Sequence, residues 1–246
     1  MNTTYTITIK NNSMYPRSFV LFQDIPGPSN IPSQDVFTNV YQRALGISGK
    51  GEDEALFEIS SECFAVHGAS TRSDMGMITV KISDYKPVKL GPQGSRFYLT
   101  NRQSPTFDRE DGSSEAAGAF IISTDDTFWS FHSKERGGFL TVYRIGDLYF
   151  GVGAKDISTG RVVPVQTYQA RPGTVAQVFP KIKYHIAFGD YQPGSIVDLI
   201  TLGRVLTIDF TGCKARSATF ILNEENMFIP DPKVQNGDIT WRVVDS

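Results

Sequence analysis

Residues 182–188, Ile-Lys-Tyr-His-Ile-Ala-Phe, are the stretch that decides the fold. Apolar side chains occupy every second position from Ile182 to Phe188, and lysine and histidine are among the residues between them. Successive side chains of a β-strand point to opposite faces, so this alternation is the pattern of a half-buried strand. The stretch therefore predicts a strand with one face in a core.

An earlier segment matches this strand. Residues 62–68 (ECFAVHG) align with residues 183–189 (KYHIAFG) at an offset of 121 positions. Further weak matches follow in a common order: 40–46 with 167–173, 97–99 with 220–222, 106–108 with 229–231, and 126–129 with 238–241. The shared order predicts two diverged copies of one unit. We expect units at 1–133 and 138–246, related by a pseudo-two-fold axis and packed either separately or as one continuous domain.

Other stretches support an all-β protein. Residues 4–9, 77–82, 205–210 and 218–222 alternate and are rich in β-branched or aromatic residues, with turn signals between them. We predict tandem-duplicated units resembling a β-sandwich or barrel, with few or no helices. One segment, 36–45, has apolar residues at helical spacing, but its partner in the second copy contains prolines, so we predict that both are extended.

Composition narrows the classes of function. The net charge is −2 and the sequence contains no basic cluster, which argues against nucleic acid as a partner. No apolar run is long enough for a membrane helix, and the N-terminus does not resemble a leader. We therefore expect a cytoplasmic protein that does not bind membranes. Its cysteines, Cys63 and Cys213, are far apart and are predicted to be buried, reduced thiols.

Motifs for cofactors are missing from the sequence. The three histidines, His67, His132 and His185, form no zinc-binding spacing, so we predict no metal site. The glycine-containing segments do not have the form of a phosphate-binding loop, and no nucleophile elbow occurs. The sequence predicts no cofactor.

The two copies differ on one strand face. The second copy has the bulky Tyr184, Ile186 and Phe188 where the first copy has Cys63, Ala65 and His67, which are smaller or more polar. The loss of side-chain volume on this face predicts a cavity. In that cavity His67 is the candidate catalytic acid or base, and Cys63 and Ala65 are the candidate binding residues.

A larger neighbour is the other outcome of this loss of bulk. Phe22 and Tyr98 are the candidates, either as binding residues that line the space or as core residues that fill it. In the second case His67 makes one buried hydrogen bond. Trp129 and Trp241, at equivalent places in the two copies, are predicted to fill equivalent core positions.

Three functions remain open. The first is binding of a small apolar molecule, with or without chemistry, as in a cofactor-independent cyclase or isomerase that relies on pocket shape and one or two acid/base groups. The second is lectin-like binding of carbohydrate with one site per repeat. The third, a membrane-active or interaction protein, lacks a recognisable amphipathic hairpin. The first is preferred because the copies have diverged unequally on the strand that ends at His67.

Overall fold

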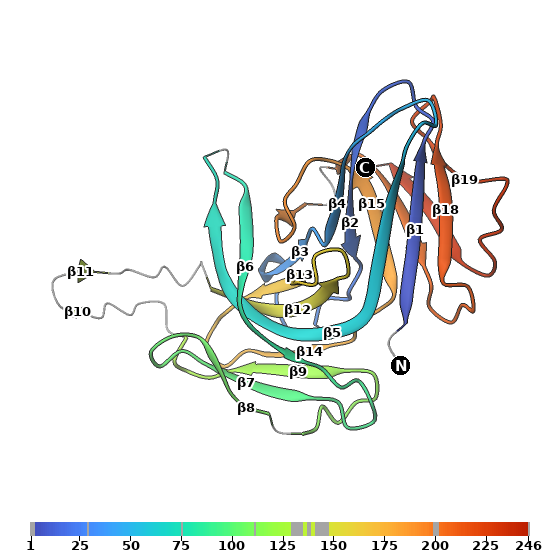
Figure 1. Cartoon of the computed structure of the whole chain (residues 1–246). Coiled ribbons are helices and arrows are strands. Elements are labelled where there is room, and N and C mark those ends of the chain that lie inside the picture. Colours follow the sequence, from blue (N-terminus) through green and yellow to red (C-terminus); the bar gives the residue numbers. More distant parts are fainter. Residues whose placement is uncertain are drawn as a thin grey trace.

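In the computed structural model, the protein is described at residues 3–28, 30–74, 76–110, 112–128, 135–136, 139–140, 148–198 and 202–245. These residues form strands and loops, with no α-helix and one short 3₁₀ turn at Ser33–Asp35 (Figure 1). The prediction of an all-β fold is therefore confirmed. Segment 36–45 is extended, as predicted, because β3 (Val36–Asn39) and β4 (Gln42–Ile47) occupy it.

Three larger sheets build the molecule. The nine-stranded sheet has the order β16 (Ile196–Val197), β3, β13 (Val162–Gln169), β12 (Leu148–Asp156), β5 (Glu54–Arg72), β1 (Thr4–Asn11), β18 (Ser217–Leu222), β19 (Phe228–Pro230), with β6 (Ile78–Pro87) also on β5. The five-stranded sheet has the order β20 (Thr240–Asp245), β17 (Arg204–Asp209), β15 (Lys183–Phe188), β2 (Arg17–Gln23), β4. The four-stranded sheet has the order β14 (Val175–Val178), β9 (Phe120–Thr124), β7 (Arg96–Thr100), β8 (Thr106–Glu110). The short strands β10 (Glu135–Arg136) and β11 (Phe139–Leu140) pair antiparallel with each other as a separate two-stranded sheet.

Strand β5 connects the parts of the nine-stranded sheet by bending. Its first half pairs with β1 and its second half pairs with β6 on the same edge, while β12 pairs along the other edge. The bend is plain in Figure 1, where β5 sweeps above the four-stranded sheet. A bulge against β6 falls between His67 and Gly68, where a Cβ on Gly68 would lie 1.9 Å from the carbonyl oxygen of Lys81. Only glycine fits there.

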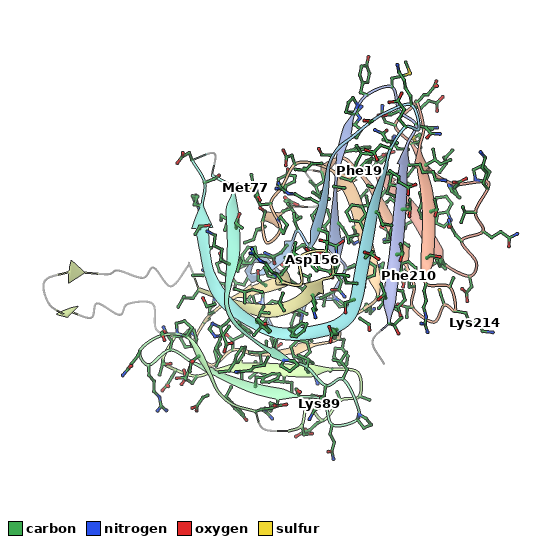
Figure 2. All side chains as sticks on the ribbon, viewed as in Figure 1. Phe19, Met77, Lys89, Asp156, Phe210 and Lys214 are labelled. Atoms are coloured by element: carbon green, nitrogen blue, oxygen red, sulfur yellow. The ribbon has the colours of Figure 1, made fainter. Side chains whose placement is uncertain are left out.

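The main core lies among the three sheets. Each contributes buried side chains to one cluster, for example Phe57 from β5, Phe97 from β7 and Ile186 from β15. Figure 2 shows Phe19 and Phe210 in this crowded interior, whereas Lys214 extends outward. A smaller cluster, which includes Val20, Phe22 and Leu202, is separate from it.

The order of strand pairing occurs twice. Strands β14, β9, β7 and β8 pair antiparallel, parallel, antiparallel, and strands β5, β1, β18 and β19 repeat that sequence. The antiparallel series β4–β2–β15–β17 likewise has the same form as β13–β12–β5–β6. This repetition fits two copies that exchange strands, but a pairing order does not establish a common origin. The duplication stays a prediction.

Residue register follows part of the predicted alignment. Ala55 pairs with Ile9 of β1, and Ala176, which lies 121 positions later, pairs with Ile122 of β9. On its other edge, each of β1 and β9 pairs with a parallel strand. Tyr41 and Tyr168 do not correspond. Tyr168 pairs with Phe150, whereas the residue opposite Phe19 is Ala44. The alignment matches His67 with Phe188, so their pairing partners Phe150 and Phe19 should also correspond. Tyr168 then corresponds to Ala44, which is three residues away from Tyr41.

Two further expectations meet the structure here. Each larger sheet contains strands from both 1–133 and 138–246, so this boundary does not separate one sheet from another. Trp241 is 41% exposed on the edge strand β20, where it packs edge-on against Phe220. It is therefore not the core residue that was expected, because an edge strand leaves one side of the ring uncovered. Trp129 lies outside the described residues.

Candidate functional site

Cys63, Ala65 and His67 occupy alternate positions of β5 and face the main core cluster. His67 is only 2% exposed, and the ring of Phe107 on β8 meets it edge-on with the ring centroids 5.0 Å apart. Neither nitrogen of His67 has a hydrogen-bond partner among the described residues. Burial lowers the pKa of His67, against a smaller opposing effect of Asp84, so the ring is neutral at pH 7.

Phe22 and Tyr98 are not brought to this face. Phe22 lies in the smaller cluster. Tyr98 lies between Phe97 and Leu99, which both belong to the main cluster, so its side chain points to the outer face of the four-stranded sheet. The large neighbour of His67 is instead Phe107. The position of Phe107 depends on a bulge between β7 and β8, and no sequence pattern predicts this bulge.

A small pocket does open beside Cys63. It encloses about 70 Å³, and Tyr184 lines it together with Cys63, but Ala65 and His67 do not. We expected a cavity beside Cys63 with no counterpart at Tyr184. This pocket does not fit that expectation, because both residues line it. Burial raises the pKa of the Cys63 thiol to about 12, so the thiol is protonated at pH 7 and is a weak nucleophile. Both cysteines are free, as predicted, and each is partly buried.

His185 has the partners that His67 lacks. Its Nδ1 lies 2.9 Å from the hydroxyl of Thr207, and its Nε2 lies 3.5 Å from a carboxylate oxygen of Asp24. Lys183 binds the same oxygen at 2.6 Å. The hydrogen bond from His185, followed by that from Lys183, holds the pKa of Asp24 well below its usual range, although burial opposes this. These residues on β15, β17 and the end of β2 form a satisfied polar network on the outer face of their sheet.

A different buried group borders a larger pocket. Tyr168 of β13 pairs with Val36 of β3 in antiparallel register, so the chain beyond Tyr168 runs alongside the turn that precedes Val36. This register brings Arg171 to Asp35 although 136 positions separate them. Nη2 of Arg171 donates a hydrogen bond to Oδ1 of Asp35 at 2.6 Å. The Asp35 side chain is 4% exposed, whereas that of Arg171 is 52% exposed.

The second oxygen of Asp35 is unsatisfied. Its Oδ2 is buried and has no hydrogen-bond partner among the described residues. A pocket of about 200 Å³ adjoins this carboxylate, and polar side chains make up much of its wall. The lining residues are Asn30, Ile31, Pro32, Asp35, Gln169, Arg171, Gly173, Thr174 and Val175. Burying an unpaired polar atom costs about 1–3 kcal/mol, so a ligand that donates a hydrogen bond to Oδ2 recovers stability.

The turn that carries Arg171 is held in place by β9. The Thr124 hydroxyl donates a hydrogen bond to the Arg171 carbonyl at 2.5 Å and accepts one from the Thr174 backbone N–H at 2.9 Å. Gly173 has a φ of 62°, the left-handed conformation that favours glycine in a turn. The sequence shows Arg-Pro-Gly as a turn signal. Nothing local connects that turn to Asp35, because the contact depends on long-range strand pairing.

A second buried carboxylate borders a larger groove. Residues 51–53, between β4 and β5, line a groove of about 500 Å³ together with Glu54 of β5, Lys10 and Asp231. Asp231 is 2% exposed, but both of its oxygens are satisfied. Lys10 Nζ donates to one oxygen at 2.8 Å and the Lys233 backbone N–H donates to the other at 2.9 Å. Neither oxygen of this carboxylate therefore lacks a hydrogen-bond partner that a ligand would supply.

Comparison with known proteins identifies the family. The family described as RhiA matches residues 2–231, so the chain belongs to the RhiA family. No curated protein sequence and no solved structure matches the chain. Among the residues that the structure describes, no helix is both long enough and apolar enough to cross a membrane, and no three side chains of His, Cys, Asp or Glu gather as a metal would require.

Proposed function

We propose that this member of the RhiA family is a small-molecule-binding protein whose ligand is a neutral, hydroxyl-rich compound such as a sugar, held in the pocket beside Asp35 and Arg171. One observation carries the proposal. Asp35 is almost completely buried, yet one of its carboxylate oxygens has no partner and the carboxylate lies next to a pocket. We infer that a ligand hydroxyl in this pocket reaches Oδ2, which the folded chain leaves covered and without a partner among the described residues.

The neighbouring groups favour a hydroxyl over an anion or an apolar ligand. Asp35 repels a carboxylate or phosphate, while the half-exposed guanidinium of Arg171 offers N–H donors to a second hydroxyl oxygen. Gln169 and Asn30 add amide groups to the wall. Adjacent hydroxyls of a sugar ring donate and accept, so they match this mixture. The pocket is smaller than the roughly 300–1,000 Å³ of sites for drug-sized ligands, which suits a single ring.

The proposal implies one site per chain, not one per repeat. Residues 24–41 separate β2 from β4 and include the turn that carries Asp35. Only residues 157–161 separate β12 from β13, the strands that occupy the corresponding places in the pairing order. No segment like the one that supplies Asp35 lies between β12 and β13, and the pocket arises where that segment meets the turn of Arg171.

A second candidate function rests on His67. A neutral imidazole with two unpartnered nitrogens is able to act as an acid or base in a cofactor-independent cyclase or isomerase acting on an apolar substrate. Substitution His67→Phe tests it. Loss of ligand binding or turnover with retained stability supports a catalytic His67. Unchanged activity removes this candidate.

The proposed sugar site is tested by titration calorimetry. Neutral monosaccharides and inositol are titrated into the wild-type protein and into Asp35→Asn, which keeps the shape of the side chain but places an amide at one of the two oxygen positions. We expect at least a tenfold loss of affinity, equivalent to about 1.4 kcal/mol, because one acceptor becomes a donor.

Asp231→Asn is the matched control. Asp231 is also buried and paired with a cation, but both of its oxygens are satisfied. Binding that survives Asp35→Asn, or that is lost in Asp231→Asn instead, contradicts the proposed site. Failure of every neutral hydroxylated probe to bind at millimolar concentration contradicts the proposed ligand class.

A further inference from the structure

We infer that the four-stranded sheet docks against the other sheets as a unit of its own, and that a ligand in the Asp35–Arg171 pocket binds only while this sheet is docked. The inference rests on the proposed function and describes how the same site is regulated. It follows from the hydrogen bonds around the pocket, because the pocket lies on the boundary between two sheets.

One wall of the pocket is attached to the nine-stranded sheet. Asp35 immediately precedes β3, and Gln169 is the last residue of β13, the neighbour of β3 in that sheet. The backbone N–H of Ala170 donates a hydrogen bond to the carbonyl oxygen of Leu148 on β12 at 2.9 Å. The chain therefore follows the nine-stranded sheet as far as residue 170.

The other wall is attached to the four-stranded sheet through Thr124, the last residue of β9. The Thr124 hydroxyl donates to the Arg171 carbonyl, and the Thr124 backbone N–H donates to the Thr174 carbonyl at 2.8 Å. The backbone N–H of Gly173 donates to the carbonyl of Asp125 at 3.3 Å. The four-stranded sheet thus holds Arg171, and the ion pair between Arg171 and Asp35 crosses the boundary between the sheets.

Side-chain packing holds the four-stranded sheet in place. Among the described residues, none of its strands pairs with a strand of another sheet, and Figure 1 shows it as a separate layer beneath β5. Phe97, Phe120 and Ile122 pack into the main core, and at the far edge Phe107 lies against His67. A sheet that shares no ladder of backbone hydrogen bonds with its neighbours is able to open as one cooperative unit.

A ligand in the pocket links the two walls. A sugar that contacts Asp35 and Arg171 touches a residue from each side of the boundary, so undocking of the sheet separates the walls and removes the site. A ligand that binds only the docked state stabilises that state by mass action. At one hundred times its dissociation constant, the ligand makes the open state about 100-fold rarer. The coupling is reciprocal, so docking of the sheet in turn favours binding.

Hydrogen exchange measured by mass spectrometry tests this coupling on the full chain. The probe is the monosaccharide or inositol that binds in calorimetry, added at about one hundred times its dissociation constant. In the free protein we expect amides of β7 and β9 to exchange faster than those of β15 and β17, because undocking costs less than unfolding. The probe is expected to slow both groups about 100-fold, since both openings destroy the site. In Asp35→Asn the same concentration is expected to slow them at most about tenfold.

Two matched core variants identify the opening unit. Phe107→Leu is expected to speed exchange in β7 and β9 of the free protein about fivefold, because undocking already breaks its contact with His67. Phe228 of β19 packs on Phe19 and Phe188, all outside the four-stranded sheet. Phe228→Leu is therefore expected to speed exchange in β15 and β17 and to leave β7 and β9 unchanged.

Thr124 is the positioning residue of the coupling. Thr124→Val keeps the shape of the side chain but removes the hydroxyl that holds the turn of Arg171. We expect the dissociation constant of the probe to rise about tenfold in Thr124→Val and to return to the wild-type value in Thr124→Ser, which keeps the hydroxyl. Equal affinity in Thr124→Val and the wild type would show that β9 does not position this wall.

The coupling and the proposed function fail in different ways. Equal exchange in β7–β9 and β15–β17 of the free protein, or equal acceleration of β7 and β9 by Phe107→Leu and Phe228→Leu, contradicts a separately docking sheet. If the probe slows β15 and β17 but not β7 and β9, the sheet opens with ligand bound, so the coupling is wrong and the pocket stands. If no neutral hydroxylated probe binds, or Asp35→Asn binds it as the wild type does, the proposed function is wrong and the coupling is wrong with it.

Discussion

His67 and Asp35 are both buried polar groups with unpartnered atoms, yet their surroundings differ. The ring of Phe107 lies edge-on against the imidazole of His67, and His67 lines none of the described pockets that contain Cys63, Asp35 or Asp231. Asp35 has a partner on one oxygen, and a pocket with further polar groups adjoins it. An unsatisfied atom indicates a ligand where open volume and complementary groups accompany it. Where they do not, it indicates a tolerated cost in the core.

The largest expected effect comes from placing a histidine in β15 at the position that the sequence alignment matches with His67. Phe188 pairs in β15 as His67 does in β5, and its ring stacks on Phe228 at 5.5 Å. Phe188→His is expected to lower the free energy of unfolding by about 2–4 kcal/mol, because a packed ring becomes a polar one without a partner. The reverse change, His67→Phe, is expected to be neutral or stabilising. Urea denaturation measures both, and a large loss in His67→Phe would show that the imidazole has a stabilising partner.

The Asp35 region is tested by removing its cation. Arg171→Ala leaves a nearly buried carboxylate with both oxygens unpaired and is expected to cost about 1–3 kcal/mol, less than for a fully buried pair because the guanidinium is half exposed. Arg43→Ala, which removes a surface pair with Asp190, serves as the control and is expected to cost at most about 1 kcal/mol. Equal losses in the two variants would mean that Asp35 is more accessible to water than its burial implies.

The pH dependence of the free energy of unfolding tests whether His67 is a buried, neutral imidazole. Burial lowers the pKa of His67 in the folded protein below its ordinary value of about 6.5, so the unfolded chain binds a proton first as the pH falls. Stability should therefore fall below about pH 6.5, by at most about 1.4 kcal/mol per pH unit. In His67→Phe this part of the pH dependence should disappear. Denaturation curves from pH 7.5 to 5 that are parallel for the two proteins would contradict a buried neutral imidazole.

The smallest effect is expected at Asp24. Hydrogen bonds from His185 and Lys183 lower the pKa of this carboxyl in the folded protein, so its stabilising effect is complete above about pH 4 and is lost as the pH falls further. Because Asp24 is one-third exposed, solvent screening limits the effect to about 1 kcal/mol. Asp24→Asn should destabilise the protein at pH 7, and the difference from the wild type should shrink steadily between about pH 4 and pH 2. A constant difference across this range would mean that the charge of Asp24 is not what stabilises the fold.

Much of the fold was predictable from local sequence patterns. Alternation in residues 4–9 and 218–222 predicted β1 and β18, because a strand with one buried face imposes a period of two on its own sequence. Alternation does not say which strands pair. The parallel pairing of β1 with β18 joins the two ends of the chain, and no local pattern encodes it.

The candidate site was less predictable for the same reason. The face of β5 that carries Cys63, Ala65 and His67 followed from parity alone. The neighbours of that face did not, since Phe107 reaches His67 through the packing of one sheet on another. Asp35 and Arg171 belong to separate turns that only the register of β3 and β13 brings together. The signal available in the sequence was an acidic residue and an arginine in turns beside predicted strands, which is too common to identify a site.

A crystal structure with the tightest-binding neutral sugar tests the central claim most directly. We predict ligand density in the pocket lined by Asn30, Gln169 and Thr174, with a hydroxyl at about 2.7 Å from Oδ2 of Asp35. Density in the groove beside Asp231, density at His67, or an empty pocket in crystals of a protein that binds the same ligand in solution would contradict it.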